Sequence, residues 1–110
     1  MSFEQQLEAV RVIAGLDNVE IKTEAGCRFL YLPQFFKTKS GEFVDCLFAC
    51  DNHQGYPNRL WFARDLSIEI QANWNHKNFC IIGRLWSAFS MKGKGATLCE
   101  ILLSHLAGVR

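Results

Sequence analysis

The sequence has little proline, no excess of either charge and no long apolar run, and each absence excludes a class of protein. It contains 2 Pro among 110 residues, and 12 Lys and Arg nearly balance 11 Asp and Glu. This near-neutral net charge argues against nonspecific electrostatic binding to nucleic acid or anionic lipid. No apolar stretch approaches the ~20 residues that span a bilayer. We therefore expect neither a nucleic-acid partner nor a membrane partner.

The chain also lacks a C-x-x-C pair and an even set of cysteines. It has 5 Cys, and its first residues, Met1–Gln6, are polar where a secretory leader would be apolar. These features predict free thiols in a reducing compartment, and therefore a cytoplasmic protein. Cys46 and Cys50 would lie ~13 Å apart on a strand that rises ~3.3 Å per residue, which is too far for two ligands of one tetrahedral ion. We expect no metal site there.

The sequence is rich in apolar and aromatic residues. Hydrophobic residues make up 49% of it, with 9 Phe and 3 Trp. A disordered chain lacks this composition, so we expect a packed globule. The length predicts a single domain over residues 1–110.

Local patterns predict a helix followed by strands. Ser2 and Gln5 form a capping-box pattern, apolar residues recur at helical spacing, and Gly15 is a plausible stop. Four β-type runs follow, separated by turn residues: Val19–Thr23, Arg28–Leu32, Phe43–Cys50 and Leu60–Ala63. Their connections are too short for crossover helices, so we expect consecutive antiparallel pairing.

The rest of the chain predicts an irregular segment and a second helix. Arg64–Arg84 mixes polar and apolar residues without a clean period. Thr97–Glu100 is a second capping box, and apolar residues at helical spacing follow it up to Gly108.

Candidate catalytic residues gather in the irregular segment around Cys80. A cysteine attacks as its thiolate and then needs a hydrogen-bond donor for the oxyanion that forms. Asn73, Asn75 and Asn78 are neutral donors of this kind, and His76 could act as a base or orient the segment. The structural alternative is that Cys80 fills the core and the polar residues cap turns.

The motifs and their order resemble a known superfamily. The third predicted strand leads into Tyr56-Pro57-Asn58, then the aromatic run Leu60-Trp61-Phe62, then Cys80, and then Trp86-Ser87 before a helix. This arrangement is similar to that of the ubiquitin-conjugating enzyme (UBC) superfamily, in particular its compact bacterial members.

The resemblance implies a fold and a set of site residues. The fold would be α+β and UBC-like: an N-terminal helix, a four-stranded antiparallel meander, an irregular active-site segment and a C-terminal helix. Cys80 would be the nucleophile, Asn73 the oxyanion-stabilising residue, and His76 an ordering or proton-transfer residue. The family's His-Pro-Asn motif is missing, so Asn75 or Asn78 could replace Asn73.

The resemblance also implies a function and its partners. Cys80 would accept the C-terminus of a ubiquitin-like or partner protein as a thioester from an activating enzyme, and pass it to an amine on a target protein. No metal or nucleotide cofactor is needed, because the thioester already stores the activation energy. In bacterial antiphage defence such a target can be a nucleotide cyclase. Two alternatives remain open: a catalytically inactive UBC-like protein-binding module, and a small structural or regulatory α+β domain.

Overall fold

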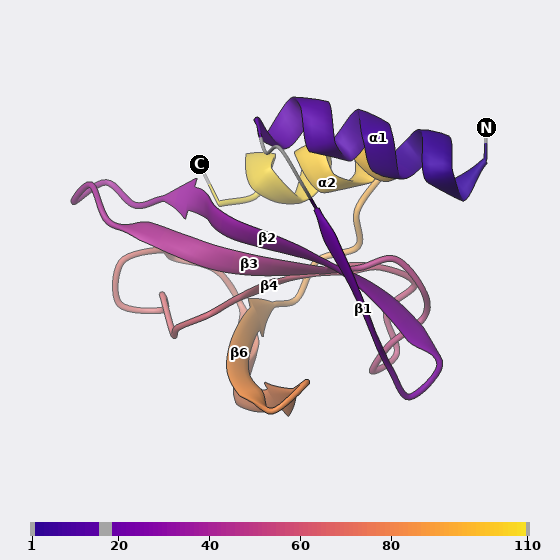
Figure 1. The fold of residues 1–110 in the computed structure, drawn as a ribbon. Coiled ribbons are helices and arrows are strands. Elements are labelled where there is room, and N and C mark those ends of the chain that lie inside the picture. Colours follow the sequence, from indigo (N-terminus) through magenta and orange to yellow (C-terminus); the bar gives the residue numbers. More distant parts are fainter. Residues whose placement is uncertain (1, 16–18, 110) are drawn as a thin grey trace.

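The computed structural model describes residues 2–15 and 19–109, which form two helices on one face of a six-stranded antiparallel sheet (Figure 1). The strand order in the sheet is β1-β2-β3-β4-β6-β5, so the last hairpin joins the sheet through its second strand. The elements in chain order are α1 (Phe3–Ala14), β1 (Glu20–Glu24), β2 (Cys27–Lys37), β3 (Phe43–Ala49), β4 (Arg59–Phe62), β5 (Trp74–Ile81), β6 (Arg84–Phe89) and α2 (Leu98–Ala107).

The predicted UBC-like fold is wrong. That prediction limited the sheet to a four-stranded meander and left residues 64–84 irregular. In the structure the second part of this segment forms β5 (Trp74–Ile81), and β6 begins at its last residue, Arg84, so the sheet has six strands. The pairing of β6 with the rest of the sheet is narrow, because only Phe62 on β4 and Ser87 on β6 stand in register.

The polar composition of β5 concealed it in the sequence. Its half-buried and exposed residues alternate at first, but Asn78 has φ 54° and the pairing register shifts between His76 and Phe79. An extra residue in one strand breaks the period of two by which strands are recognised. The outer side of the hairpin meets solvent, so polar residues occupy it at little cost.

The two helices lie close to their predicted positions because their signals are local. Both hydrogen bonds of the capping box between Ser2 and Gln5 are present, and Gly15 ends α1 with φ 66°. The side chain of Gln6 on α1 accepts a hydrogen bond from the backbone N–H of Leu98, 2.9 Å away. This bond satisfies one of the free N–H groups at the start of α2 and ties the helices together.

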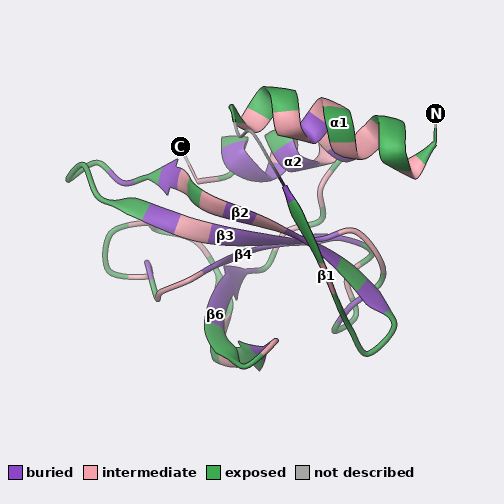
Figure 2. Cartoon of the chain, viewed as in Figure 1, coloured by how far each residue is buried: buried purple, intermediate pink, exposed green. Residues whose placement is uncertain are grey.

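Apolar side chains pack on both faces of the sheet, and Figure 2 marks the buried residues along the strands and helices. The helix-side core lies between the sheet and the two helices and includes Leu30, Phe48, Phe62 and Leu102. The hairpin-side cluster lies beneath β5 and β6, and its buried members are Cys27, Phe29, Leu47, Ala49, Trp61, Ile81, Trp86 and Ala88. The β5–β6 hairpin bends away from the helices and covers this second cluster on the opposite face of the sheet (Figure 1).

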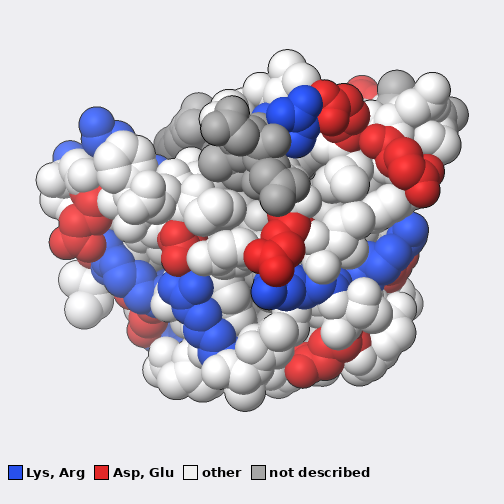
Figure 3. Space-filling view, viewed as in Figure 1, with Lys and Arg blue, Asp and Glu red and all other residues white. Residues whose placement is uncertain are grey.

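The surface carries mixed charge. Acidic and basic side chains are interspersed over the face shown in Figure 3, and the net charge of the chain is +1. Within residues 2–15 and 19–109, neither helix has the length and hydropathy required to cross a membrane.

Candidate functional site

Cys80 lies on the outer side of the β5–β6 hairpin. It pairs with Leu85 across the hairpin, and it is the one exposed residue among the 5 cysteines. Its neighbours Phe79 and Ile81 turn inward to the hairpin-side cluster. The pleat of the strand therefore directs the Cys80 side chain to solvent. Its exposure contrasts with the core-filling alternative.

The other four thiols are buried or half-buried. Burial raises the pKa of Cys46 well above its ordinary value, and raises that of Cys50 to about 12. Burial also raises the pKa of Cys27 and of Cys99. A thiol reacts as its thiolate, so these four are poor nucleophiles.

His76 lies on the opposite side of the hairpin from Cys80. Its ring packs against Trp61 and Phe79 with centroids 5.5 and 5.3 Å away. Its Nδ1 lies 2.6 Å from Nη1 of Arg59. Because a guanidinium only donates, Nδ1 must accept this bond, and the neutral ring carries its proton on Nε2. Burial and then the charge of Arg59 lower the pKa of His76.

The three Asn residues have separate surroundings. Asn73 stands beside the start of β5, where its carbonyl accepts from Ser90 N–H at 2.6 Å. Asn75 accepts from Nη2 of Arg59 and donates through Nδ2 to the Tyr56 hydroxyl at 2.7 Å. Asn78 is exposed two residues before Cys80, and its backbone N–H donates to the Ser87 hydroxyl at 3.1 Å.

The structure therefore separates the predicted site residues into two groups. Within the described residues, no hydrogen bond joins Cys80 to either His76 or Asn73. Asn78 is the amide that shares the exposed side of β5 with Cys80.

His76 and Asn75 belong instead to a network around Arg59. The Arg59 side chain is 0% exposed, its guanidinium carbon lies 4.1 Å from the centre of the Tyr56 ring, and it also lies over Trp61. The Tyr56 hydroxyl is 3.0 Å from the Ser90 hydroxyl. This network joins the turn before β4 to the ends of β5 and β6.

Sequence reasoning assigned Tyr56 to a turn and did not single out Arg59. A signal was present, because Arg59 begins a strand whose other residues, Leu60 to Phe62, are all apolar and buried. Charged residues are rarely fully buried without a partner. The position of Arg59 in that run was the only hint of the network.

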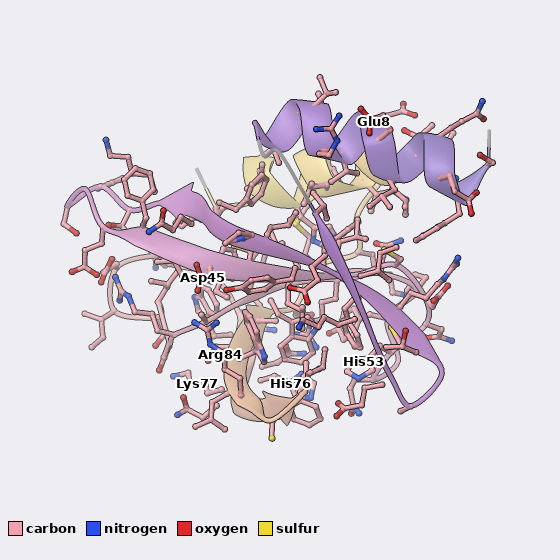
Figure 4. All side chains as sticks on the ribbon, in the orientation of Figure 1. Glu8, Asp45, His53, His76, Lys77 and Arg84 are labelled. Atoms are coloured by element: carbon pink, nitrogen blue, oxygen red, sulfur yellow. The ribbon has the colours of Figure 1, made fainter. Side chains whose placement is uncertain are left out.

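A second polar contact braces the hairpin against the sheet. Asp45 on β3 accepts from Arg84 on β6 at 3.0 Å, and both are labelled in Figure 4. Asp45 also accepts from the N–H of Gln34 and from the Tyr31 hydroxyl. Although burial raises the pKa of Asp45, these bonds and the charge of Arg84 outweigh it and lower the pKa.

The described residues contain no cluster of side chains that could bind a metal ion. Within residues 2–15 and 19–109, no three His, Cys, Asp or Glu side chains gather closely enough to hold an ion. Figure 4 shows His53 apart from His76, toward the β1–β2 hairpin. The candidate chemistry is therefore that of an exposed thiol and of a buried guanidinium network.

No protein-family model, curated protein or solved structure gives a significant match to the sequence or structure of this chain.

Proposed function

We propose that the protein is a cysteine-based acyl carrier acting in a reducing cytoplasm. The Cys80 sulfur attacks the carbonyl carbon of a thioester at the C-terminus of a ubiquitin-like or partner protein. A new C–S bond forms and the thiol of an activating enzyme leaves. An amine of the target then attacks the same carbon, an amide forms, the amine loses a proton, and the Cys80 thiolate is released.

The observation that carries the proposal is the exposure of Cys80 alone among the cysteines. The sulfur of a carrier must reach two large protein partners in turn, so it has to be accessible from solvent. The exposed position of Cys80 on β5 is consistent with this requirement. No cofactor is required, since the incoming thioester is already activated.

Asn78 is the proposed donor for the oxyanion. Its exposed side is that of Cys80, and a neutral amide stabilises developing negative charge without pairing with the thiolate. Removing one such donor typically slows a reaction by ~10²–10³-fold. His76, held by Arg59, would act only by positioning the strand.

A synthetic peptide thioester tests the carrier directly. Incubation with the protein and then with Nα-acetyl-lysine should give an intact-mass adduct that free thiol removes and that passes the peptide to the lysine amine. Cys80→Ala should abolish the adduct, Cys80→Ser should give a thiol-resistant ester, and Cys99→Ala should behave as wild type.

The decisive comparison is with a small thiol. Acyl transfer from Cys80 to lysine should be faster than from the same peptide thioester of glutathione, and Asn78→Ala should remove most of the advantage. Transfer no faster than from glutathione would contradict the proposal, because the protein would then add nothing to the chemistry of a free thiol.

The second candidate is a protein-binding module, and an apolar groove favours it. The groove is about 540 Å³ in volume and is lined by Ile13, Ala14, Phe35, Leu103, Leu106 and Ala107. Ile13 is 50% exposed and Leu103 44% exposed. If this groove is the functional surface, Ile13→Asp or Leu103→Asp should abolish association with a captured partner, whereas Cys80→Ala should leave it intact.

A further inference from the structure

The positively charged guanidinium of Arg59 lies buried against the Tyr56 ring. Arg59 is 0% exposed, and within the described residues it forms no ion pair with Asp or Glu. Its Nε has no hydrogen-bond partner there either. Buried charges in proteins are normally paired, because removing an ion from water costs several kcal/mol (about 5 or more). Among the described residues Arg59 is held by neutral partners, His76, Asn75 and the rings of Tyr56 and Trp61, so β4 carries a buried cation without a counter-ion.

Neutral hydrogen-bond donors cover that cation. The Tyr56 ring stacks on Arg59 at 4.1 Å, and the Tyr56 hydroxyl accepts from Asn75 Nδ2 at 2.7 Å. The Ser90 hydroxyl lies 3.0 Å from the Tyr56 oxygen. When Tyr56 accepts from Asn75, it can donate its own proton to Ser90, and the Ser90 proton then faces outward. Asn75 and Ser90 are both exposed, so a solute can reach this end of the chain of donors.

The field around these donors is positive. A hydrogen bond from Ser90 lowers the pKa of Tyr56 most and burial opposes it, while a hydrogen bond from Asn75 and the charges of Arg59 and Lys92 lower the pKa further. Lys92 follows Ser90 closely on the segment that leads to α2. Two cations therefore act on one cluster of hydroxyl and amide donors, and no carboxylate contributes to the shift at Tyr56.

We propose that Tyr56, Asn75, Ser90 and Lys92 bind the phosphate group of a small phosphate monoester over the buried Arg59. A phosphate monoester is a dianion near neutral pH, so its charge matches the two cations. Its tetrahedral oxygens accept several bonds at once, and charge-assisted bonds of this kind are stronger than neutral ones. A carboxylate would leave one positive charge unbalanced. This site is independent of Cys80 and goes beyond the proposed carrier function.

The test is an NMR titration of the ¹⁵N-labelled protein at pH 7.5 and constant ionic strength. The probes are inorganic phosphate, glycerol 3-phosphate and acetate. The expected result is a saturable shift of the Asn75 and Ser90 amides and of the Arg59 Nε–H with both phosphates, and weaker binding of acetate. Ser90→Ala and Lys92→Ala should each weaken glycerol 3-phosphate binding by about tenfold, in line with the loss of one charge-assisted bond.

Lys94→Ala provides the matched control, because Lys94 lies on the same segment but does not act on Tyr56. It should leave the affinity unchanged. The proposal is overturned if the shifts do not saturate, if acetate binds as tightly as glycerol 3-phosphate, or if Lys94→Ala weakens binding as much as Lys92→Ala. Ser90, Lys92 and Lys94 are all exposed, so all three variants should fold, and amide spectra of the free variants will check this.

Discussion

The five cysteines should differ in their reactivity toward an alkylating reagent by several orders of magnitude. Cys80 is exposed, Cys50 and Cys99 are half-buried, and Cys27 and Cys46 are buried. The perturbation is iodoacetamide added to the native protein at pH 8. We expect Cys80 to react first and to complete its reaction before any other cysteine is appreciably modified.

The size of the difference follows from burial. Burial raises the pKa of Cys50 from 9.0 to about 12. Since only the thiolate reacts, such a rise lowers the reactive fraction near pH 8 by about a thousandfold relative to an ordinary thiol. Cys46 is 0% exposed and must wait for the chain to open. If that opening costs even ~5 kcal/mol, the low end of protein stabilities, it adds a factor of ~10³–10⁴.

Quenched time points and peptide mass spectrometry give one rate constant for each cysteine. In strong denaturant the five rates should converge, which shows that the differences come from the fold. Cys80→Ala should remove the fast phase, while Cys99→Ala should keep it. A rate at Cys50 or Cys46 comparable to that of Cys80 would refute the reasoning, because it would place β3 outside the core.

Two further predictions concern stability. Burial lowers the pKa of His105 to about 4. Between pH 6.5 and 4 the unfolded chain therefore binds a proton that the folded chain does not. The free energy of unfolding should thus fall by up to ~1.4 kcal/mol for each unit by which the pH falls. Urea unfolding at several pH values checks this, and His105→Gln should flatten the profile more than His76→Gln; equal slopes would contradict it. Gly83 has φ +70° beside Ile82 with φ 53°, the conformation of a type I′ hairpin turn, so Gly83→Ala should lower the free energy of unfolding by ~1 kcal/mol. Ile68→Ala, at a side chain that is 99% exposed, is the control and should stay within ~0.5 kcal/mol.

The helices could be predicted because their determinants are contiguous in sequence. The capping residues Ser2 and Thr97 and the glycine after α1 act within a turn of the residues that they cap. Three of the first four strands lie within a residue of their predicted bounds for a similar reason, since each apolar run is bounded by turn residues, whereas β2 extends five residues beyond its predicted end at Leu32. Short-range patterns were enough for those elements.

The β5–β6 hairpin could not be predicted in the same way because its stability is not local. Its residues are held by contacts with distant strands: Phe79 stacks on Trp61 of β4, and Arg84 pairs with Asp45 of β3. The turn at Ile82-Gly83 also lacks the Asn-Gly pair that usually marks such a hairpin. Tertiary packing overrode a weak local pattern.

The extra residue in β5 also separates two candidate site residues that are close in sequence. His76 and Cys80 are four residues apart on one strand, a spacing that would place both on one face of a regular strand. The extra residue at Asn78 reverses the pleat between them, so the His76 ring turns inward toward Arg59 while Cys80 turns to solvent. Under the proposed carrier function, the donor for an oxyanion at Cys80 would therefore be Asn78 and not His76. The imidazole of His76 instead accepts a hydrogen bond from the buried Arg59, 2.6 Å away.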